Sequence, residues 1–403
     1  MDGGSNSVKK TVAYLFLSAS DQDNSVQRKV ASQITGLMAE GVDVTGVFFT
    51  FRDRAETYGL NNIQSVNVEK VKGNFFLGLR KKVLMTRDLL RWANQNAHRY
   101  DVLYLRNYRP GVRWWWFMVK YGKKCITEHQ TIELAEIRAL ASENPFGWRP
   151  GRFLSWLEHV ALPIASEKIW GSLALGFTSK ILAVTREIGN YEYRRAYPKK
   201  PRVYVVSNGI DVQAFPLRTA PVYDGSKLIL LMLVGGSTEV DWHGIDLIVE
   251  GIKQYKGPVQ IQLWLAGDPD ILEKYQEHFI RHLGFCNKQE LDVIANEVHL
   301  GLGSFALERK GIKEACSLKM RDYAARGIPV ICGQEDTDYE PLFTSRLAMK
   351  CKSMEPPDMK FVITFYNELG KKPEFSQQIR QIAFREMDTS VKMKQLKQVF
   401  YED

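Results

Sequence analysis

Long apolar segments are missing from this sequence of 403 residues. The longest uninterrupted apolar run, Leu228 to Val234, has seven residues, whereas a helix that crosses a bilayer needs about 20. The apolar stretch from Thr11 to Ala19 is too short for a secretory leader and predicts a first buried strand instead. We therefore expect no membrane-spanning helix.

Cysteine is also scarce. The five cysteines are odd in number and widely scattered, and they form no C-x-x-C pair of the kind that binds zinc or carries redox chemistry. This pattern predicts a reduced, cytosolic protein. The sequence also lacks an internal repeat of fixed period and any low-complexity segment, so neither a repeat protein nor a disordered chain is expected.

The composition is that of a folded protein, with 45% hydrophobic and 25% charged residues. At about 150 residues per domain, its length predicts two or three domains. The net charge of +9 is unevenly spread: residues 1–200 hold 30 Lys and Arg against 18 Asp and Glu, and residues 201–403 hold 25 against 28. The basic first half indicates an anionic surface or ligand as its partner, or simply a solvated basic face.

Short apolar stretches alternate with amphipathic ones, which is typical of parallel α/β sheets. The expected strands are 12–19, 42–50, 102–105, 125–128, 181–185, 203–206, 228–234, 261–266, 298–302 and 328–332. The expected helices are 25–40, 77–97, 112–121, one from 186, 245–255, 271–283, 318–326 and 375–401, with a mostly helical region at 132–174. A polar stretch at 213–226 predicts an interdomain link. The fold class is therefore α/β, with two doubly wound domains and ligands at the carboxyl ends of the strands.

The segment from Phe305 to Ile331 holds the strongest candidate site. Lys319 falls in the first turn of the expected helix, after Ser317 as N-cap, where the helix dipole disfavours a cation. A bound phosphate would compensate, with Arg309 and Lys310 adding charge from the preceding loop. The alternative is that Lys319 extends into solvent.

Two acids flank this helix start. Glu314 precedes the helix and Asp322 lies eight residues later on its second turn. Carboxylates placed in this way can accept hydrogen bonds from sugar or ribose hydroxyls. Two unrelated surface charges would show the same spacing.

This E-x7-D pattern, with the helix running into ARGIPVI and the turn SNGID at Ser207 to Asp211, resembles the retaining GT-B glycosyltransferases of glycosyltransferase family four. The likeness is greatest to bacterial members that build surface polysaccharides. It implies two Rossmann-like domains facing a cleft. Residues 1–208 with a returning helix at about 385–403 would bind the acceptor, and 209–384 would bind a nucleotide sugar. It also implies hexosyl transfer to a glycan or lipid-linked acceptor, with no cofactor and no metal.

The resemblance assigns roles by position. His129, Glu314 and Lys319 are expected to be catalytic. Donor contacts are expected from Asn208, Gly209, Gly235, Gly236, His243, Arg309, Lys310, Cys316, Ser317, Leu318 and Asp322, and acceptor contacts from Asn24, Arg28 and Lys29. The loop GGSTEVDWHG departs from the family, because it lacks the usual Arg and Lys and has His243 at the lysine's place.

A basic, aromatic segment at 75–92 and the run Trp114 to Trp116 suggest attachment to an anionic membrane at the inner face of the cell membrane. Core aromatics with a charged rim would give the same pattern. Three other functions stay open: a sugar-nucleotide epimerase, a DNA-modifying enzyme and a non-catalytic binding protein. No recognised nucleic-acid-binding motif accompanies the basic charge, so we expect no nucleic-acid partner.

Overall fold

The computed structural model describes residues 9–18, 25–51, 59–69, 77–106, 111–141, 146–147, 150–235, 241–372 and 374–402. The chain forms two compact units. The first comprises Met1–Val206 with Lys392–Asp403, and the second comprises Ser207–Val391. Among the described residues, no helix combines the length and the apolar character that crossing a membrane requires.

The first unit is built on a seven-stranded sheet in which all pairs are parallel. In spatial order its strands are β3 (Ile63–Asn67), β2 (Asp43–Thr50), β1 (Thr11–Leu17), β4 (Val102–Arg106), β5 (Cys125–His129), β6 (Lys180–Ala183) and β7 (Arg202–Val205). The chain order reverses between β1 and β4, so this unit is doubly wound, and ligands are expected at such a reversal.

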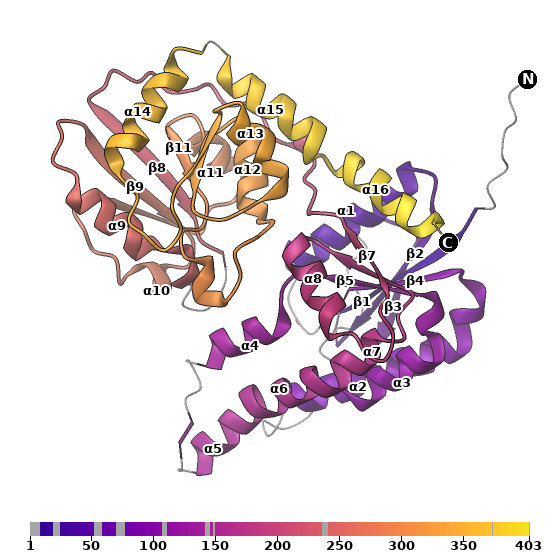
Figure 1. Cartoon of the computed structure of the whole chain (residues 1–403). Coiled ribbons are helices and arrows are strands. Elements are labelled where there is room, and N and C mark those ends of the chain that lie inside the picture. Colours follow the sequence, from indigo (N-terminus) through magenta and orange to yellow (C-terminus); the bar gives the residue numbers. More distant parts are fainter. Residues whose placement is uncertain are drawn as a thin grey trace, which may run out of the picture. The chain divides into compact units, whose positions relative to one another are not determined.

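Helices cover both faces of this sheet (Figure 1). The helices of this unit are α1 (Ser25–Ala39), α2 (Leu77–Asn96), α3 (Val112–Tyr121), α4 (Glu133–Ala141), α5 (Pro150–Trp156), α6 (Leu162–Ser166), α7 (Ser172–Leu175), α8 (Arg186–Arg195) and α16 (Thr389–Tyr401). Alternate residues of β1 enter two separate apolar clusters, one shared with α2 and α3 and the other with α1 and α16. Burial on both faces explains why this strand is apolar without interruption.

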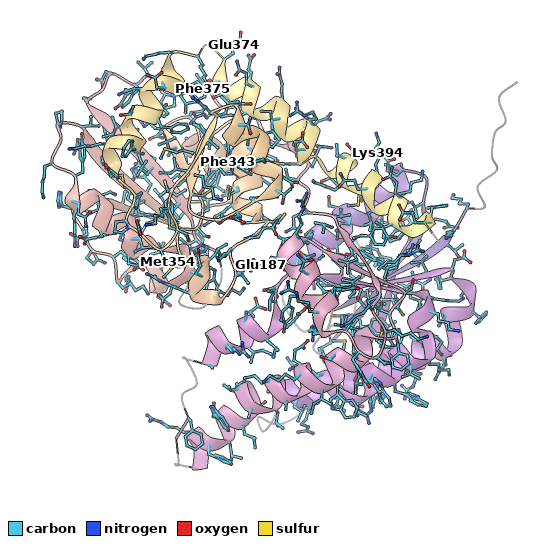
Figure 2. The ribbon with its side chains drawn as sticks, viewed as in Figure 1. Glu187, Phe343, Met354, Glu374, Phe375 and Lys394 are labelled. Atoms are coloured by element: carbon cyan, nitrogen blue, oxygen red, sulfur yellow. The ribbon has the colours of Figure 1, made fainter. Side chains whose placement is uncertain are left out.

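The second unit has a six-stranded parallel sheet. Its strands, in spatial order, are β10 (Ile280–Gly284), β9 (Gln260–Ala266), β8 (Lys227–Leu233), β11 (Leu300–Leu302), β12 (Val330–Cys332) and β13 (Ala348–Lys350). Its helices are α9 (Ile245–Gln254), α10 (Pro269–Leu272), α11 (Lys288–Ile294), α12 (Leu318–Arg326), α13 (Glu340–Thr344), α14 (Met359–Gly370) and α15 (Phe375–Glu386). Phe343 and Phe375, both labelled in Figure 2, pack against its apolar core. The α/β prediction with two doubly wound domains is confirmed.

Two sequence expectations for the second unit are corrected, and elements of both units were not predicted from the sequence. The helix expected at 271–283 is a single turn, α10, followed by strand β10. Ile280 and Leu283 pack on the core from β10, and parallel pairing with β9 overrides a helical pattern of residues. The stretch 213–226 is no link, because buried Arg218 donates to the carbonyl of Val298 at 2.6 Å within the second unit. β3, β13 and α14 were not expected at all.

Candidate functional site

The amino-terminal end of α12 carries the candidate anion site of the second unit. Ser317 is the N-cap of this helix, and its hydroxyl is buried without a hydrogen-bond partner among the described residues. Lys319, in the first turn, donates to His243 Nδ1 at 3.0 Å, and that nitrogen also lies 3.2 Å from Ser304 Oγ. The Nε2 atom of His243 is buried and unpartnered as well. Free helix amides, a lysine and a histidine thus come together at one helix end.

Both bases of this pair hold their protons weakly. Burial lowers the pKa of Lys319 to about 7, although the residue as a whole is partly exposed. Burial lowers the pKa of His243 well below its ordinary value, and the nearby charges of Lys319 and Lys310 lower it further. A phosphate placed here would favour the charged form of both groups and raise both pKa values. The site is therefore arranged to gain protons when an anion binds.

Arg309, which was expected to add charge to a phosphate site, is paired with a carboxylate in this structure. Arg309 forms a bidentate ion pair with Asp246 at 2.8 and 2.6 Å and also donates to the carbonyl of Asp241. Lys310 lies over the ring of Trp242, 5.1 Å from its centroid. Of the two residues, only Lys310 contributes a positive charge that acts on His243.

The two acids of the E-x7-D pattern have different surroundings. Glu314 Oε1 accepts a hydrogen bond from Thr337 Oγ1 at 2.7 Å. Asp322 pairs with Arg326 at 3.3 Å, and Arg326 in turn pairs with Asp292 on α11 at 2.9 Å. Burial raises the pKa of Asp322 to about 6 even though Arg326 opposes the shift. Asp322 is thus already engaged by its neighbour on α12.

The turn at Asn208 is fixed to the segment before α12. Asn208 Nδ2 donates to the carbonyl of Cys316 at 2.8 Å, and its backbone N–H donates to Cys316 Sγ at 2.8 Å. Burial raises the pKa of Cys316 to about 12, which excludes a thiolate nucleophile at neutral pH. Gly209 follows in the same turn, and Leu318 is 41% exposed at the helix start. Gly235 lies two residues after the end of β8, and Gly236 lies outside the described residues.

A buried ion-pair group beneath this turn was not expected from the sequence. The Arg321 guanidinium, which is fully buried, pairs with Asp336 and, at 2.8 Å, with Asp338. Asp338 also accepts from Ser207 Oγ at 2.6 Å, and Arg321 donates to the carbonyl of Asn208. These contacts hold the turn and the helix start together. No spacing in the sequence links position 321 with 336 and 338.

In the first unit, His129 ends β5 and is fully buried. Its Nδ1 lies 3.5 Å from carboxylate oxygens of both Glu133 and Glu192, and its Nε2 lies 3.1 Å from Thr127 Oγ1. Arg195 pairs with Glu192 at 2.7 Å and with Glu167 at 2.6 Å. We call His129, Glu133, Glu167, Glu192 and Arg195 the His129 cluster.

The carboxylates of the His129 cluster favour the protonated form of His129. Burial by itself lowers the pKa of His129, but the carboxylates of Glu192 and Glu133 outweigh it, and the net shift is upward. Burial raises the pKa of Glu192 to about 7, against the opposing effect of His129. Three carboxylates beside one guanidinium therefore favour a protonated imidazole. Of these partners, only Glu133 has a sequence signal, four residues after His129.

The residues expected to contact an acceptor are only partly described. Lys29 Nζ donates to Gln130 Oε1 at 2.9 Å and pairs with buried Glu128 at 3.4 Å. Burial would raise the pKa of Glu128, but the charges of Lys29 and Arg106 lower it. Asn24 and the side chain of Arg28 lie outside the described residues. Lys29 is thus paired with a carboxylate in this structure.

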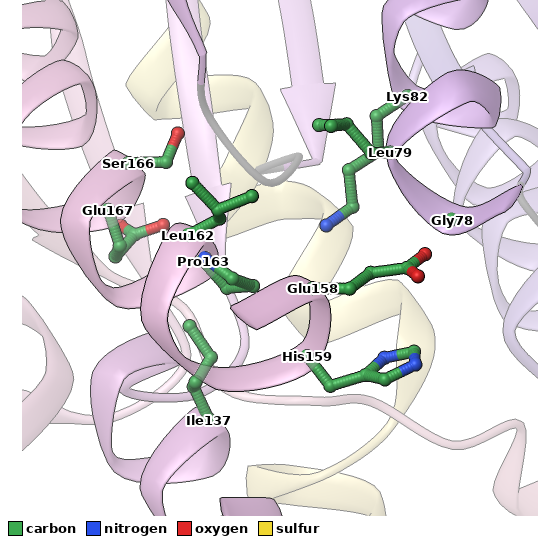
Figure 3. Close-up of a pocket in the computed structure, with 10 residues that line it drawn as sticks. All are labelled: Gly78, Leu79, Lys82, Ile137, Glu158, His159, Leu162, Pro163, Ser166 and Glu167. Atoms are coloured by element: carbon green, nitrogen blue, oxygen red, sulfur yellow. The ribbon is translucent and has the colours of Figure 1, made fainter. Parts of the chain in front are cut away.

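A pocket of about 100 Å³ adjoins the His129 cluster. It lies between α2 and a continuous helical stretch, 150–175, that contains π-helical turns at Leu157–Ala161 and Glu167–Gly171. Figure 3 shows its lining, with apolar Leu79, Ile137 and Leu162 beside the carboxylates of Glu158 and Glu167. Glu167 belongs to both the pocket and the cluster, so a ligand in the pocket would lie next to the groups around His129.

Comparisons with known proteins were made for the sequence and for the fold. Residues 26–214 match the sequence model of Glycosyltransferase Family 4. This match covers residues 26–206 of the first unit, without β1 and the carboxyl-terminal part at 392–403, and it stops before Glu314 and Lys319. No curated protein gives a significant match to the sequence.

Solved structures match the whole chain at low identity. Anabaena HepE in complex with UDP and glucose is 13% identical with a TM-score of 0.61, over 98% of this chain and 100% of that one. WaaG, a glycosyltransferase involved in lipopolysaccharide biosynthesis, is 12% identical with a TM-score of 0.60, over 96% and 99%. The N-terminal domain of Candida albicans trehalose-6-phosphate phosphatase is 10% identical with a TM-score of 0.61, over 99% and 98%.

These likenesses are too distant in sequence to carry an activity, but they establish the architecture. The two parallel sheets of seven and six strands with flanking helices are those of the GT-B glycosyltransferases. The chain therefore has the GT-B fold, and its first unit matches the sequence model of Glycosyltransferase Family 4.

Proposed function

We propose that this protein is a retaining, metal-independent glycosyltransferase that moves a hexosyl group from a nucleotide diphosphate sugar to a glycan or lipid-linked acceptor. The observation that carries the proposal is the pair of Lys319 and His243 at the start of α12. Lys319 Nζ lies 3.0 Å from His243 Nδ1, and the pKa of each group is lowered. Such a pair, beside free helix amides, suits the two charges of a diphosphate. The GT-B fold and the match to the family model support the same reading.

The chain's own groups would act by positioning and by electrostatics. Lys319, His243 and the first amides of α12 would stabilise the charge that grows on the departing diphosphate. The bond from the sugar's anomeric carbon to the diphosphate breaks, and the acceptor oxygen bonds on the same face. The acceptor's proton passes to the leaving phosphate. Glu314 would hold a hydroxyl of the donor sugar. The catalytic role of His129 in the first unit stays a prediction.

UDP-glucose is the first donor to test, because HepE, which shares the fold, was solved with UDP and glucose. WaaG is a glycosyltransferase involved in lipopolysaccharide biosynthesis, and by this analogy we propose a role for the present protein in the synthesis of a bacterial surface polysaccharide. Its location would then be cytoplasmic, at the inner face of the cell membrane.

The surface of the first unit supports such an attachment. Trp116 and Val112 on α3 are each 54% exposed, and Leu79 on α2 is 42% exposed beside Arg80 and Lys81. Exposed apolar groups with neighbouring cations suit the headgroup layer of an anionic membrane. The membrane-binding surface predicted from the sequence is corrected in part, because Trp92 and Trp114 are buried in the core.

A non-catalytic binding protein is the second candidate. The loop before α9 lacks the Arg and Lys that the resemblance leads one to expect, and Arg309 is held by Asp246. The phosphatase domain named above also shows that this fold occurs in a protein whose name does not describe a transferase.

Release of UDP from UDP-glucose, followed over time with the full-length protein, separates the two candidates. We expect slow hydrolysis without acceptor, reduced roughly 10- to 100-fold by Glu314→Gln, since a hydrogen bond to a charged group contributes about 1.5–3 kcal/mol. Glu297→Gln, at an exposed acid of the same unit, is the control. Binding of UDP without any turnover would favour the non-catalytic reading. Loss of turnover in EDTA, restored by Mg²⁺, would contradict metal independence.

A further inference from the structure

A second, larger pocket lies at the opposite edge of the first unit's sheet. It has a volume of about 410 Å³, within the range of small-molecule sites. Lys180 and Arg202 in its lining are the first residues of β6 and β7, whereas His129 is the last residue of β5. Because these strands are parallel, the pocket lies at their amino-terminal edge. It is therefore distinct from the candidate site around His129.

The lining of this pocket is strongly basic. Five of its ten residues are cationic, namely Lys123, Lys180, Lys199, Lys200 and Arg202, and none is acidic. They come from three separate segments: the turn after α3, the loop into β6 and the segment before β7. Cations that converge in this way repel one another unless an anion lies among them.

The positive charge of the lining is not cancelled by ion pairs of Lys123, Lys199 or Lys200. The ammonium of Lys200 donates to three neutral backbone carbonyls at the end of α8, at 2.7 to 3.0 Å. Lys123 and Lys199 are exposed, and within the described part of the chain their side chains make no hydrogen bond or ion pair. The ammonium of Lys180 likewise donates to the neutral carbonyl of Val399 at 2.7 Å.

One carboxylate lies close to the pocket without lining it. Burial raises the pKa of the Tyr204 hydroxyl, and the Glu402 carboxylate adds to this rise while Arg202 opposes it. The described residues that line the pocket include no acid, so the lining carries a net positive charge.

The walls of the pocket are held by close backbone packing. A Cβ added to Gly122 would lie 2.2 Å from the carbonyl oxygen of Phe177, and one added to Gly176 would lie 2.0 Å from that of Tyr197. Thr178 Oγ1 donates to the carbonyl of Cys125 at 3.0 Å. These contacts fix the three segments against each other before any ligand arrives, which reduces the ordering cost of binding.

We propose that this pocket binds a soluble ligand that carries two or more phosphate groups, and that this binding is separate from the transferase site. One phosphate would leave most of the 410 Å³ unfilled, and the cationic residues of the lining come from three separate segments. Lysine ammonium groups act as point charges toward phosphate. The cations line a recess, and this shape suits a compact soluble anion better than the plane of a membrane.

The test uses full-length protein with Lys319→Met as the parent, so that the proposed donor site contributes little phosphate binding. Inorganic tripolyphosphate is titrated by calorimetry into this parent, into a version that adds Lys123→Glu and Lys199→Glu, and into a control that adds Lys256→Glu and Lys360→Glu. All four lysines are exposed, and both pairs change the net charge equally. Thermal unfolding checks that each protein is folded.

We expect tripolyphosphate to bind the parent at one site. Its dissociation constant should rise at least tenfold in the pocket variant and less than threefold in the control. Equal weakening in both, or no binding to the parent, overturns the proposal. In a second arm, vesicles with anionic lipid should bind the parent and the pocket variant alike. If vesicle binding alone depends on Lys123 and Lys199, the pocket recognises a membrane and the proposal is wrong.

Discussion

Replacing Lys319 by methionine should make the free protein more stable while it abolishes donor binding. Burial moves the pKa of this lysine from 10.5 to about 7, and each unit is equivalent to about 1.4 kcal/mol. The charged form thus costs the folded state roughly 5 kcal/mol at most. Because the residue is partly exposed, water screens part of this cost, and we expect a gain of about 1–3 kcal/mol.

The sign of the pH dependence follows from the lowered pKa. Below pH 7 lysine is charged in both the folded and the unfolded state, so the full cost applies and the variant's advantage is largest. From pH 7 to about 10.5 the folded protein loses its proton first, and the advantage shrinks. Urea unfolding at pH 6, 8 and 10 measures this trend, and UDP titration measures binding. Lys360→Met, at an exposed lysine, should change stability by less than about 0.5 kcal/mol. A Lys319→Met protein that is less stable at pH 6, or that still binds UDP as the wild type does, would refute the reasoning.

Three further predictions concern other parts of the chain. Glu192→Gln should lower the pKa of His129, because a carboxylate that raises it is lost; an unchanged histidine titration by NMR would contradict this. Arg321→Met should cost about 3–5 kcal/mol in urea unfolding, since it leaves two carboxylates near the protein interior without their cation, whereas exposed Arg385→Met should cost little. Gly176→Ala should lower the melting temperature, because its Cβ would lie 2.0 Å from a backbone carbonyl oxygen; unchanged melting would show that the loop moves freely.

Strongly patterned elements could be predicted from the sequence. The apolar run at β8 is buried on both sides, and α12 lies between Ser317 and Gly327, where the cap signals place it. Gly327 has φ +76, which favours glycine at this helix end. The elements that were not predicted correctly are those that depend on partners distant in the sequence. β10 forms because β9 offers an open edge, and nothing within residues 271–283 reports that edge.

The candidate site shows the same division. Lys319 was predicted from its place in a helix start, which is local information. The contact between Lys319 and His243 joins positions 76 residues apart, and Glu192 reaches His129 from a different helix. Side-chain pairs of this kind follow from the folded sheet order, so the sequence pattern alone could not identify them. The same holds for Arg309, whose partner Asp246 lies 63 positions away. Its donor contact stays a prediction.

Helix α16 bears on the order in which the molecule can fold during synthesis. Its residues Leu396, Val399 and Phe400 complete an apolar cluster with Val12 and Tyr14 of β1. The whole of Ser207–Val391 must leave the ribosome before those side chains can reach the strand they cover. The apolar residues on this face of the sheet therefore lack the cover of α16 until residues 207–391 have been translated.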